Sequence, residues 1–151
     1  MSSVLEQATA RGEEAYLRVF QSYSGLYGLK SLETIHEQPV CKEWSRDTYG
    51  LLLRDNIFMS LGAKLAIKRF VVDEKSNALH DYVELQHKNQ TYLLDGTWQQ
   101  FLDPDRRSPE LPRILSGNYD FCVAFAIEAG MDPIKQIVWD DRFTERLDVH
   151  E

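Results

Sequence analysis

The chain has 151 residues, 43% of them hydrophobic, which is enough for one domain with its own core. Its formal net charge of −7 argues against nucleic acid as a partner, because phosphate binding relies on clustered Lys and Arg side chains. No apolar run reaches the roughly 18 residues that a membrane-spanning helix needs, so no membrane partner is expected either.

The N-terminal residues contain no basic leader followed by an apolar block, so the sequence predicts no Sec-type signal peptide. We expect a cytoplasmic protein, with export by a route that needs no such signal as the alternative. The two cysteines, Cys41 and Cys122, do not indicate a disulfide framework. No His or Cys spacing typical of a metal site occurs, and no cofactor is expected.

The first half of the chain is predicted to be helical. Apolar residues recur at helical spacing over residues 4–22, and the sequence SGLYG at 24–28 is expected to end that helix. Residues 31–37 are predicted as a short helix before Pro39. A further helix is predicted over residues 41–54, because its apolar side chains share one face.

Strands are predicted next. Residues 64–73 form the first strand, and the sequence EKSN at 74–77 forms a turn. Residues 79–87 and 90–95 form a hairpin joined at Lys88-Asn89.

Beyond the hairpin, residues 103–113 are a loop that contains three of the five prolines, and residues 114–117 are a candidate fourth strand. A last helix is predicted from a cap at Asn118 to Gly130. The order of elements predicts a single α+β domain over residues 1–151, in which helices pack on an antiparallel sheet of about four strands.

One cysteine occupies a position that suits a nucleophile. Cys41 is the first residue of the helix predicted over 41–54, where the aligned peptide dipoles favour negative charge and backbone N–H groups can face an oxyanion. The alternative interpretation is a cysteine buried at the core end of the helix, since buried Cys usually behaves as a small hydrophobe. Cys122 lies between Phe121 and Val123 in an apolar run and is predicted to be core.

The hairpin places a histidine and an aspartate on one face. If Lys88 and Asn89 form a two-residue turn, Tyr82 lies opposite Asp95, and His80 shares the face of Tyr82. His80 and Asp95 are then diagonal neighbours with Cα atoms roughly 7–8 Å apart, a gap that an imidazole and a carboxylate can bridge. Taken singly, His80 at a strand start and Asp95 before a glycine are more often local structure.

Together these residues resemble the transglutaminase-like branch of the papain-like cysteine enzymes. HDYVEL at 80–85 is similar to the histidine strand of that family, and YLLDGTWQQF at 92–101 is similar to its aspartate strand, with Gly96 where Pro is usual. The resemblance covers roughly residues 39–101 and extends to small bacterial glutamine deamidases of the same superfamily.

The resemblance implies a Cys-His-Asp catalytic triad, with Cys41 as nucleophile, His80 as general base and acid, and Asp95 as the orienting group. It implies acyl transfer or hydrolysis at an amide or thioester carbonyl of a protein, peptide or other acyl substrate, without a cofactor. Glutamine deamidation or amide formation is favoured over proteolysis.

Three further residues have two interpretations each. Gln38 is a candidate second oxyanion donor or a solvated loop residue. Trp44 and Trp98 are candidate walls of the acyl site, or core aromatics near it.

The competing hypothesis for the whole chain is a non-catalytic immunity or adaptor domain, whose acidic surface would suit a basic protein partner. A metal site at Cys41 and His80 has too few ligands with sensible spacing. The sequence does not predict an oligomeric state.

Overall fold

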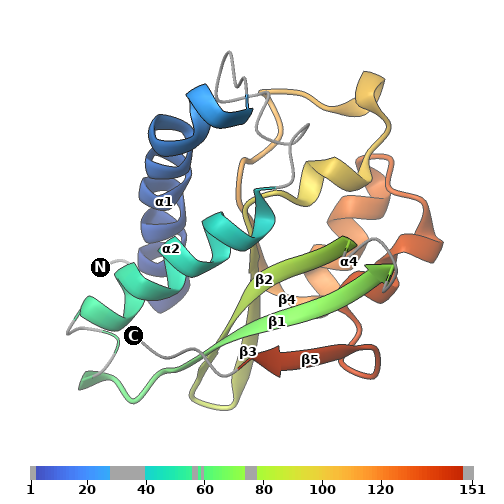
Figure 1. Ribbon diagram of the computed structural model, residues 1–151. Coiled ribbons are helices and arrows are strands. Elements are labelled where there is room, and N and C mark those ends of the chain that lie inside the picture. Colours follow the sequence, from blue (N-terminus) through green and yellow to red (C-terminus); the bar gives the residue numbers. More distant parts are fainter. Residues whose placement is uncertain (1–2, 28–39, 56–57, 59, 74–77, 148–151) are drawn as a thin grey trace.

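The chain folds into helices packed on both sides of one antiparallel sheet (Figure 1). The computed structural model describes residues 3–27, 40–55, 58, 60–73 and 78–147. The elements are α1 Val4–Tyr27, α2 Cys41–Arg54, β1 Lys64–Asp73, β2 Ala78–His87, β3 Gln90–Asp95, β4 Leu115–Asn118, α4 Tyr119–Glu128 and β5 Thr144–Leu147, with short 3-10 helices η2 Trp98–Phe101, η3 Pro104–Arg106 and η4 Pro133–Trp139.

The sheet has five strands in the order β4-β3-β2-β1-β5, and all neighbours run antiparallel. The predicted α+β class with an antiparallel sheet against helices is therefore confirmed, with one strand more than the expected four. No helix in the described part of the chain is long and apolar enough to cross a membrane.

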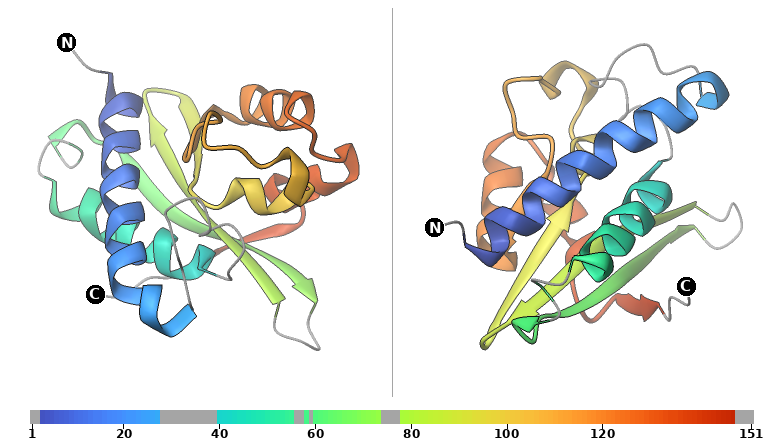
Figure 2. Two further views of the ribbon diagram at one scale, coloured as in Figure 1. Left: turned by 90° about the horizontal axis from the view of Figure 1, so that it is seen from above. Right: turned by 90° about the vertical axis from the view of Figure 1, so that its left-hand side faces the viewer.

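Each face of the sheet has its own hydrophobic cluster. Helices α1 and α2 lie on one side of the sheet and α4 lies on the other (Figure 2). Because side chains alternate along a strand, Val83 and Leu85 of β2 enter the cluster under α1 and α2, whereas Tyr82 enters the cluster that contains Cys122 and Trp139. His80 shares the face of Tyr82 by the same alternation.

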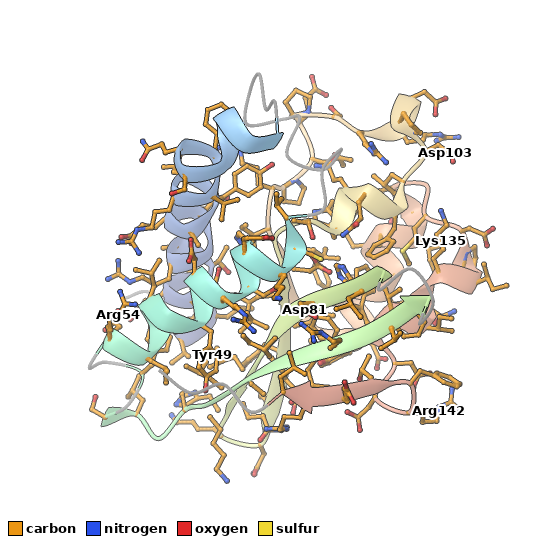
Figure 3. All side chains as sticks on the ribbon, in the orientation of Figure 1. Tyr49, Arg54, Asp81, Asp103, Lys135 and Arg142 are labelled. Atoms are coloured by element: carbon orange, nitrogen blue, oxygen red, sulfur yellow. The ribbon has the colours of Figure 1, made fainter. Side chains whose placement is uncertain are left out.

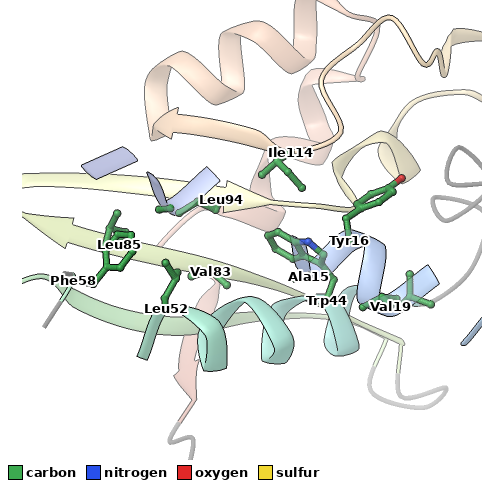
Figure 4. Packing of buried hydrophobic residues seen from close by; sticks show 12 residues of the cluster. Ala15, Tyr16, Val19, Trp44, Leu52, Phe58, Val83, Leu85, Leu94 and Ile114 are labelled. Atoms are coloured by element: carbon green, nitrogen blue, oxygen red, sulfur yellow. The ribbon is translucent and has the colours of Figure 1, made fainter. Parts of the chain in front are cut away.

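Trp44 anchors α2 to α1 within the first cluster. Its indole lies among Ala15, Tyr16 and Ile114 (Figure 4) and has no exposed surface. The indole N–H donates a hydrogen bond of 3.0 Å to the carbonyl of Gly12 in α1. This contact ties the first turn of α2 to α1. Trp44 lies three residues after Cys41, so the contact also holds Cys41 in place.

Most predicted element boundaries match the structure. The predictions for α2, β1 and β3 are confirmed at both ends, β2 begins one residue earlier than expected, and α4 begins after the predicted Asn118 cap, whose side chain accepts from the Phe121 N–H. Strand β4 lies one residue later than the predicted 114–117. The helix predicted over 31–37 and the turn over 74–77 lie outside the described residues.

One expectation was wrong, and two segments near the C-terminal end of the described chain were not expected. Helix α1 continues to Tyr27, so the sequence SGLYG does not end it after residue 22. The segments η4 and β5 were not predicted, because η4 has few residues and β5 carries charged side chains at two of its four positions. Both are stabilised by contacts with the rest of the fold rather than by local pattern.

A buried carboxylate joins β5 to the sheet. Glu84 of β2 is 5% exposed and accepts hydrogen bonds from the Tyr119 hydroxyl at 2.6 Å and from Arg146 at 3.0 Å. The ammonium of Lys68 lies 4.0 Å away and also pairs with Asp141. These cations compensate the charge of Glu84, which would otherwise be costly to bury.

We expect Glu84→Ala to lower the free energy of unfolding by about 2 kcal/mol, because it leaves the buried ammonium of Lys68 with one carboxylate fewer and removes the acceptor of the Tyr119 hydroxyl and of Arg146. Glu128→Ala is the matched control: it removes an exposed carboxylate from α4 and should change the unfolding free energy by less than about 0.5 kcal/mol. Urea denaturation measures both. Equal losses in the two variants would contradict the structural role of Glu84.

Candidate active site

The thiol of Cys41 lies at the start of β2. Cys41 is the first residue of α2, as predicted, and is 6% exposed. Its Sγ–H donates a hydrogen bond of 3.5 Å to the carbonyl of Leu79, the residue before His80. The first backbone N–H groups of a helix have no intrahelical partner, and the N-cap residue Val40 makes no side-chain cap. The thiol therefore lies beside polar groups at a positive helix end.

The hairpin brings His80 and Asp95 together. Lys88 and Asn89 have positive φ values of 50° and 60°, as a tight two-residue hairpin turn requires, and His87 pairs with Gln90. The predicted register is therefore confirmed. His80 Nε2 lies 2.5 Å from Asp95 Oδ2, and both side chains are almost completely buried.

Asp95 is held by donors from three segments. Its Oδ1 accepts from the backbone N–H of Thr97 at 3.0 Å, and its Oδ2 accepts from the indole N–H of Trp139 at 2.8 Å as well as from His80. A carboxylate without exposed surface needs such donors to stay ionised. The whole set is assembled by the turn after β3 and by η4.

The other side of the imidazole also has a partner. Gln100 Nε2 lies 3.1 Å from His80 Nδ1 and 3.0 Å from Thr97 Oγ1, to which it donates. The ring of Phe101 meets the imidazole edge-to-face, with centroids 4.6 Å apart. In the neutral ring, Nε2 carries the proton that faces Asp95, and Nδ1 accepts from Gln100. The ring is thus fixed in one tautomer and one orientation.

The charge of Asp95 dominates the protonation of His80. Burial is the largest single influence and by itself lowers the pKa of the imidazole. The charge and hydrogen bond of Asp95, with the Cys41 side chain acting in the same direction, outweigh burial and raise the pKa from 6.5 to about 10. His80 is therefore an imidazolium at neutral pH.

Cys122 is core, as predicted. It has no exposed surface, and it packs in the second cluster with Leu93 and Ala126. Burial, with a smaller contribution from the charge of Asp95, raises the pKa of the Cys122 thiol to about 12. A thiol in this state is neither a good nucleophile nor accessible.

An ion pair that the sequence did not suggest lies near Cys41. Arg69 of β1 donates two hydrogen bonds, of 2.7 and 2.9 Å, to the fully buried carboxylate of Asp81 in β2. Asp81 is labelled in Figure 3. The hydrogen bond with Asp81 is the main influence that raises the pKa of Arg69, and the charge of Cys41 adds a smaller one. A permanent cation thus lies within electrostatic reach of the thiol.

The remaining predicted site residues have different outcomes. Trp44 and Trp98 have no exposed surface and belong to the two hydrophobic clusters, which favours the core interpretation over walls of an acyl site. Gln38 lies outside the described residues. The sequence predicts no role for Gln100 or Trp139. Proximity to Asp95 in the chain was the available signal for Gln100, and none existed for Trp139, 44 residues away.

Gly96 links the site to the core. A Cβ atom at this position would overlap the indole of Trp44, so the residue after Asp95 has to be glycine for α2 to pack against the end of β3. This close approach is the structural reason for glycine at position 96.

Comparisons with family models, with curated proteins and with solved structures found no match to this chain. Among the residues that the structure describes, no group of three or more His, Cys, Asp or Glu side chains is placed to hold a metal ion.

We expect the pair of His80 and Asp95 to make stability depend on pH. The folded pKa of His80, about 10, lies above its ordinary value of 6.5, so the pair's contribution to stability is complete below about pH 6.5 and is lost as the pH rises towards 10. In Asp95→Asn the pKa of His80 should fall, because the carboxylate charge that raises it most is lost while burial continues to lower it. NMR titration of the imidazole and urea unfolding at pH 6 and pH 9 measure both effects. A His80 pKa that is unchanged in Asp95→Asn would contradict the assignment.

Gly96→Ala should lower the free energy of unfolding by about 2 kcal/mol through overpacking against Trp44, and should slow alkylation of Cys41 by displacing the start of α2. The control is Gly50→Ala in the same helix, where the new methyl meets the flexible end of Arg54 and helix propensity favours alanine. Thermal unfolding and iodoacetamide kinetics distinguish the two variants. If Gly50→Ala is the more harmful, the close approach at Gly96 is not the constraint.

Proposed function

We propose that this chain is a cysteine-dependent amidohydrolase or acyltransferase, with Cys41 as nucleophile, His80 as general base and acid, and Asp95 as the orienting carboxylate. The observation that carries the proposal is the buried 2.5 Å contact between His80 Nε2 and Asp95 Oδ2 beside a thiol at a helix N-terminus. A base oriented by a third group next to a thiol is the arrangement that nucleophilic catalysis uses.

The proposed reaction begins from a thiolate–imidazolium pair, in which the proton of the Cys41 thiol resides on Nδ1 of His80. The thiolate then attacks the carbonyl carbon of an amide, and the carbonyl oxygen becomes an oxyanion. The tetrahedral adduct collapses, the C–N bond breaks, and the leaving nitrogen takes the proton from Nδ1, which leaves a thioester on Cys41. Water, deprotonated by His80, releases an acid, whereas an amine gives a new amide.

Two donors are proposed for the oxyanion. One is the backbone N–H of Cys41 at the first position of α2. The other is the amide of Gln100, whose Nε2 is already 3.1 Å from Nδ1 of His80. When Nδ1 takes the thiol proton it ceases to be an acceptor, so one N–H of Gln100 becomes available beside the reacting atoms. Gln100 takes the place proposed for Gln38, which lies outside the described residues.

For the substrate we propose a glutamine side chain of a protein or peptide, with deamidation or amide formation as the outcome. The resemblance of the His80 and Asp95 strands to transglutaminase-like enzymes supports this choice. No step of the reaction calls for a cofactor.

A non-catalytic binding domain is the second candidate. The observations that favour it are the low exposure of Cys41, 6%, and the occupation of His80 Nδ1 by Gln100. A chain that kept the buried pair only for stability would show both features. Reactivity of the thiol separates the two functions, because a binding domain has no need of an activated Cys41.

We expect iodoacetamide to label Cys41 at least ~10-fold faster than Cys122 at pH 7, since the thiolate is the reactive form and Cys122 is buried as a thiol. Peptide mapping by mass spectrometry measures the ratio. Incubation with glutamine-containing proteins should then give a mass gain of ~1 Da per deamidated side chain, or a loss of ~17 Da per amine transfer with release of ammonia.

The matched variants are Cys41→Ala and Cys122→Ala. The first should abolish the mass change and the second should preserve it, because Cys122 contributes only packing. Faster labelling of Cys122, or activity that survives Cys41→Ala, would sink the proposed mechanism.

A further inference from the structure

The three tryptophans of the chain can be compared by the acceptors of their indole N–H groups. All are at most 2% exposed, and each donates one indole hydrogen bond of similar length. Trp44 donates to the carbonyl of Gly12 at 3.0 Å, and Trp98 donates to the carbonyl of Pro112 at 2.9 Å. Trp139 alone among the three donates to a charged group, Asp95 Oδ2, at 2.8 Å.

Trp139 and His80 share one oxygen of Asp95. Oδ2 accepts from the imidazole and from the indole, while Oδ1 is held by the backbone N–H of Thr97. The Thr97 hydroxyl also donates to Oδ1, at 3.5 Å, so both oxygens of the carboxylate are held and its orientation is fixed. A charge-assisted hydrogen bond in a buried site is strong. Because Asp95 has no exposed surface, bulk solvent does not supply a donor in place of the indole.

Trp139 also packs against Phe101, which in turn packs against the imidazole of His80. Its ring meets Phe101 edge-to-face at 6.0 Å, and Phe101 meets His80 edge-to-face at 4.6 Å. The segment Pro133–Trp139 therefore contacts both members of the pair, directly at Asp95 and through Phe101 at His80. This segment belongs to the C-terminal part of the chain, far from the hairpin in sequence.

We propose that Trp139 is a positioning residue for the His80–Asp95 pair: its indole N–H holds Oδ2 in line with Nε2 and takes up part of the carboxylate charge. The inference deepens the proposed function and rests on it for its catalytic meaning. Its physical content, the coupling of the indole to the protonation of His80, stands without any substrate.

The sign of the coupling follows from the charges. Deprotonation of the imidazolium leaves Asp95 without its cation, and the indole donor then stabilises the carboxylate more than before. Trp139 therefore eases the release of the proton from His80, and removal of the indole N–H makes His80 hold its proton more tightly.

Other titratable groups that face the pair come from three elements. They are Cys41 of α2, Tyr82 of β2 and Cys122 of α4. Burial raises the pKa of Tyr82 and that of Cys122 to about 12 in each case, so both stay neutral over the pH range of the test. Arg69, beside Cys41, stays charged throughout.

The experiment compares Trp139→Phe with Trp98→Phe and Trp44→Phe. Each variant keeps an aromatic ring and loses one indole N–H, so the packing losses are similar. NMR titration of the His80 imidazole should show an upward shift of about 0.5 pH unit or more in Trp139→Phe, roughly a threefold change in proton affinity, and no such shift in the two controls. The alkaline limb of the Cys41 alkylation profile should move with it.

A measurement on the unmodified chain covers the case in which Trp139→Phe does not fold. The indole N–H resonance of Trp139 should follow the titration of His80, while the resonances of Trp98 and Trp44 should not. An absent or downward shift, a shift equal to that of a control, or an indole signal that ignores His80 would overturn the inference. Inactivity of Cys41 towards substrates would overturn the proposed function and leave this coupling intact.

Discussion

A carboxylate without exposed surface beside a buried imidazole is the constraint on which much of this fold depends. Water solvates neither group, so the protein has to supply donors for Asp95 and a counter-charge for His80. The turn after β3 supplies one donor through Thr97, and η4 supplies another through Trp139. Removal of either segment would leave a buried charge with too few partners, which makes the pair a structural element as well as a chemical one.

The site lies at the start of β2 and uses residues from both sides of the sheet. Cys41 comes from α2, which packs on one face, whereas the partners Phe101 and Trp139 belong to the cluster on the other face. The thiol contacts the main chain of β2 at Leu79. The next residue, His80, directs its imidazole towards Phe101 and Asp95. The packing of Trp44 against Gly12 and Gly96 holds α2 in the position that places Cys41 beside β2.

What the sequence predicted and what it missed follow from the range of each interaction. His80 and Asp95 lie on one hairpin, so a period of two and a two-residue turn were enough to bring them together. Arg69 and Asp81 also lie on neighbouring strands, but a bulge between Val71 and Asp73 shifts the register by one residue. Counting from the pairing of Asp73 with Ala78 would have placed Arg69 opposite Tyr82 instead. Trp139 depends on the path of the whole C-terminal part, which no local pattern encodes.

The partners of His80 make opposite demands on its proton. Asp95 at Nε2 favours the imidazolium, whereas the amide of Gln100, as a donor to Nδ1, favours the neutral ring. A full charge in a site closed to water outweighs one neutral hydrogen bond, so Nδ1 takes a proton and Gln100 has to turn its N–H elsewhere. Under the proposed mechanism, the N–H of Gln100 donates to the oxyanion instead. The amide that meets Nδ1 of the neutral ring thus becomes a donor to the oxyanion once the thiolate–imidazolium pair has formed.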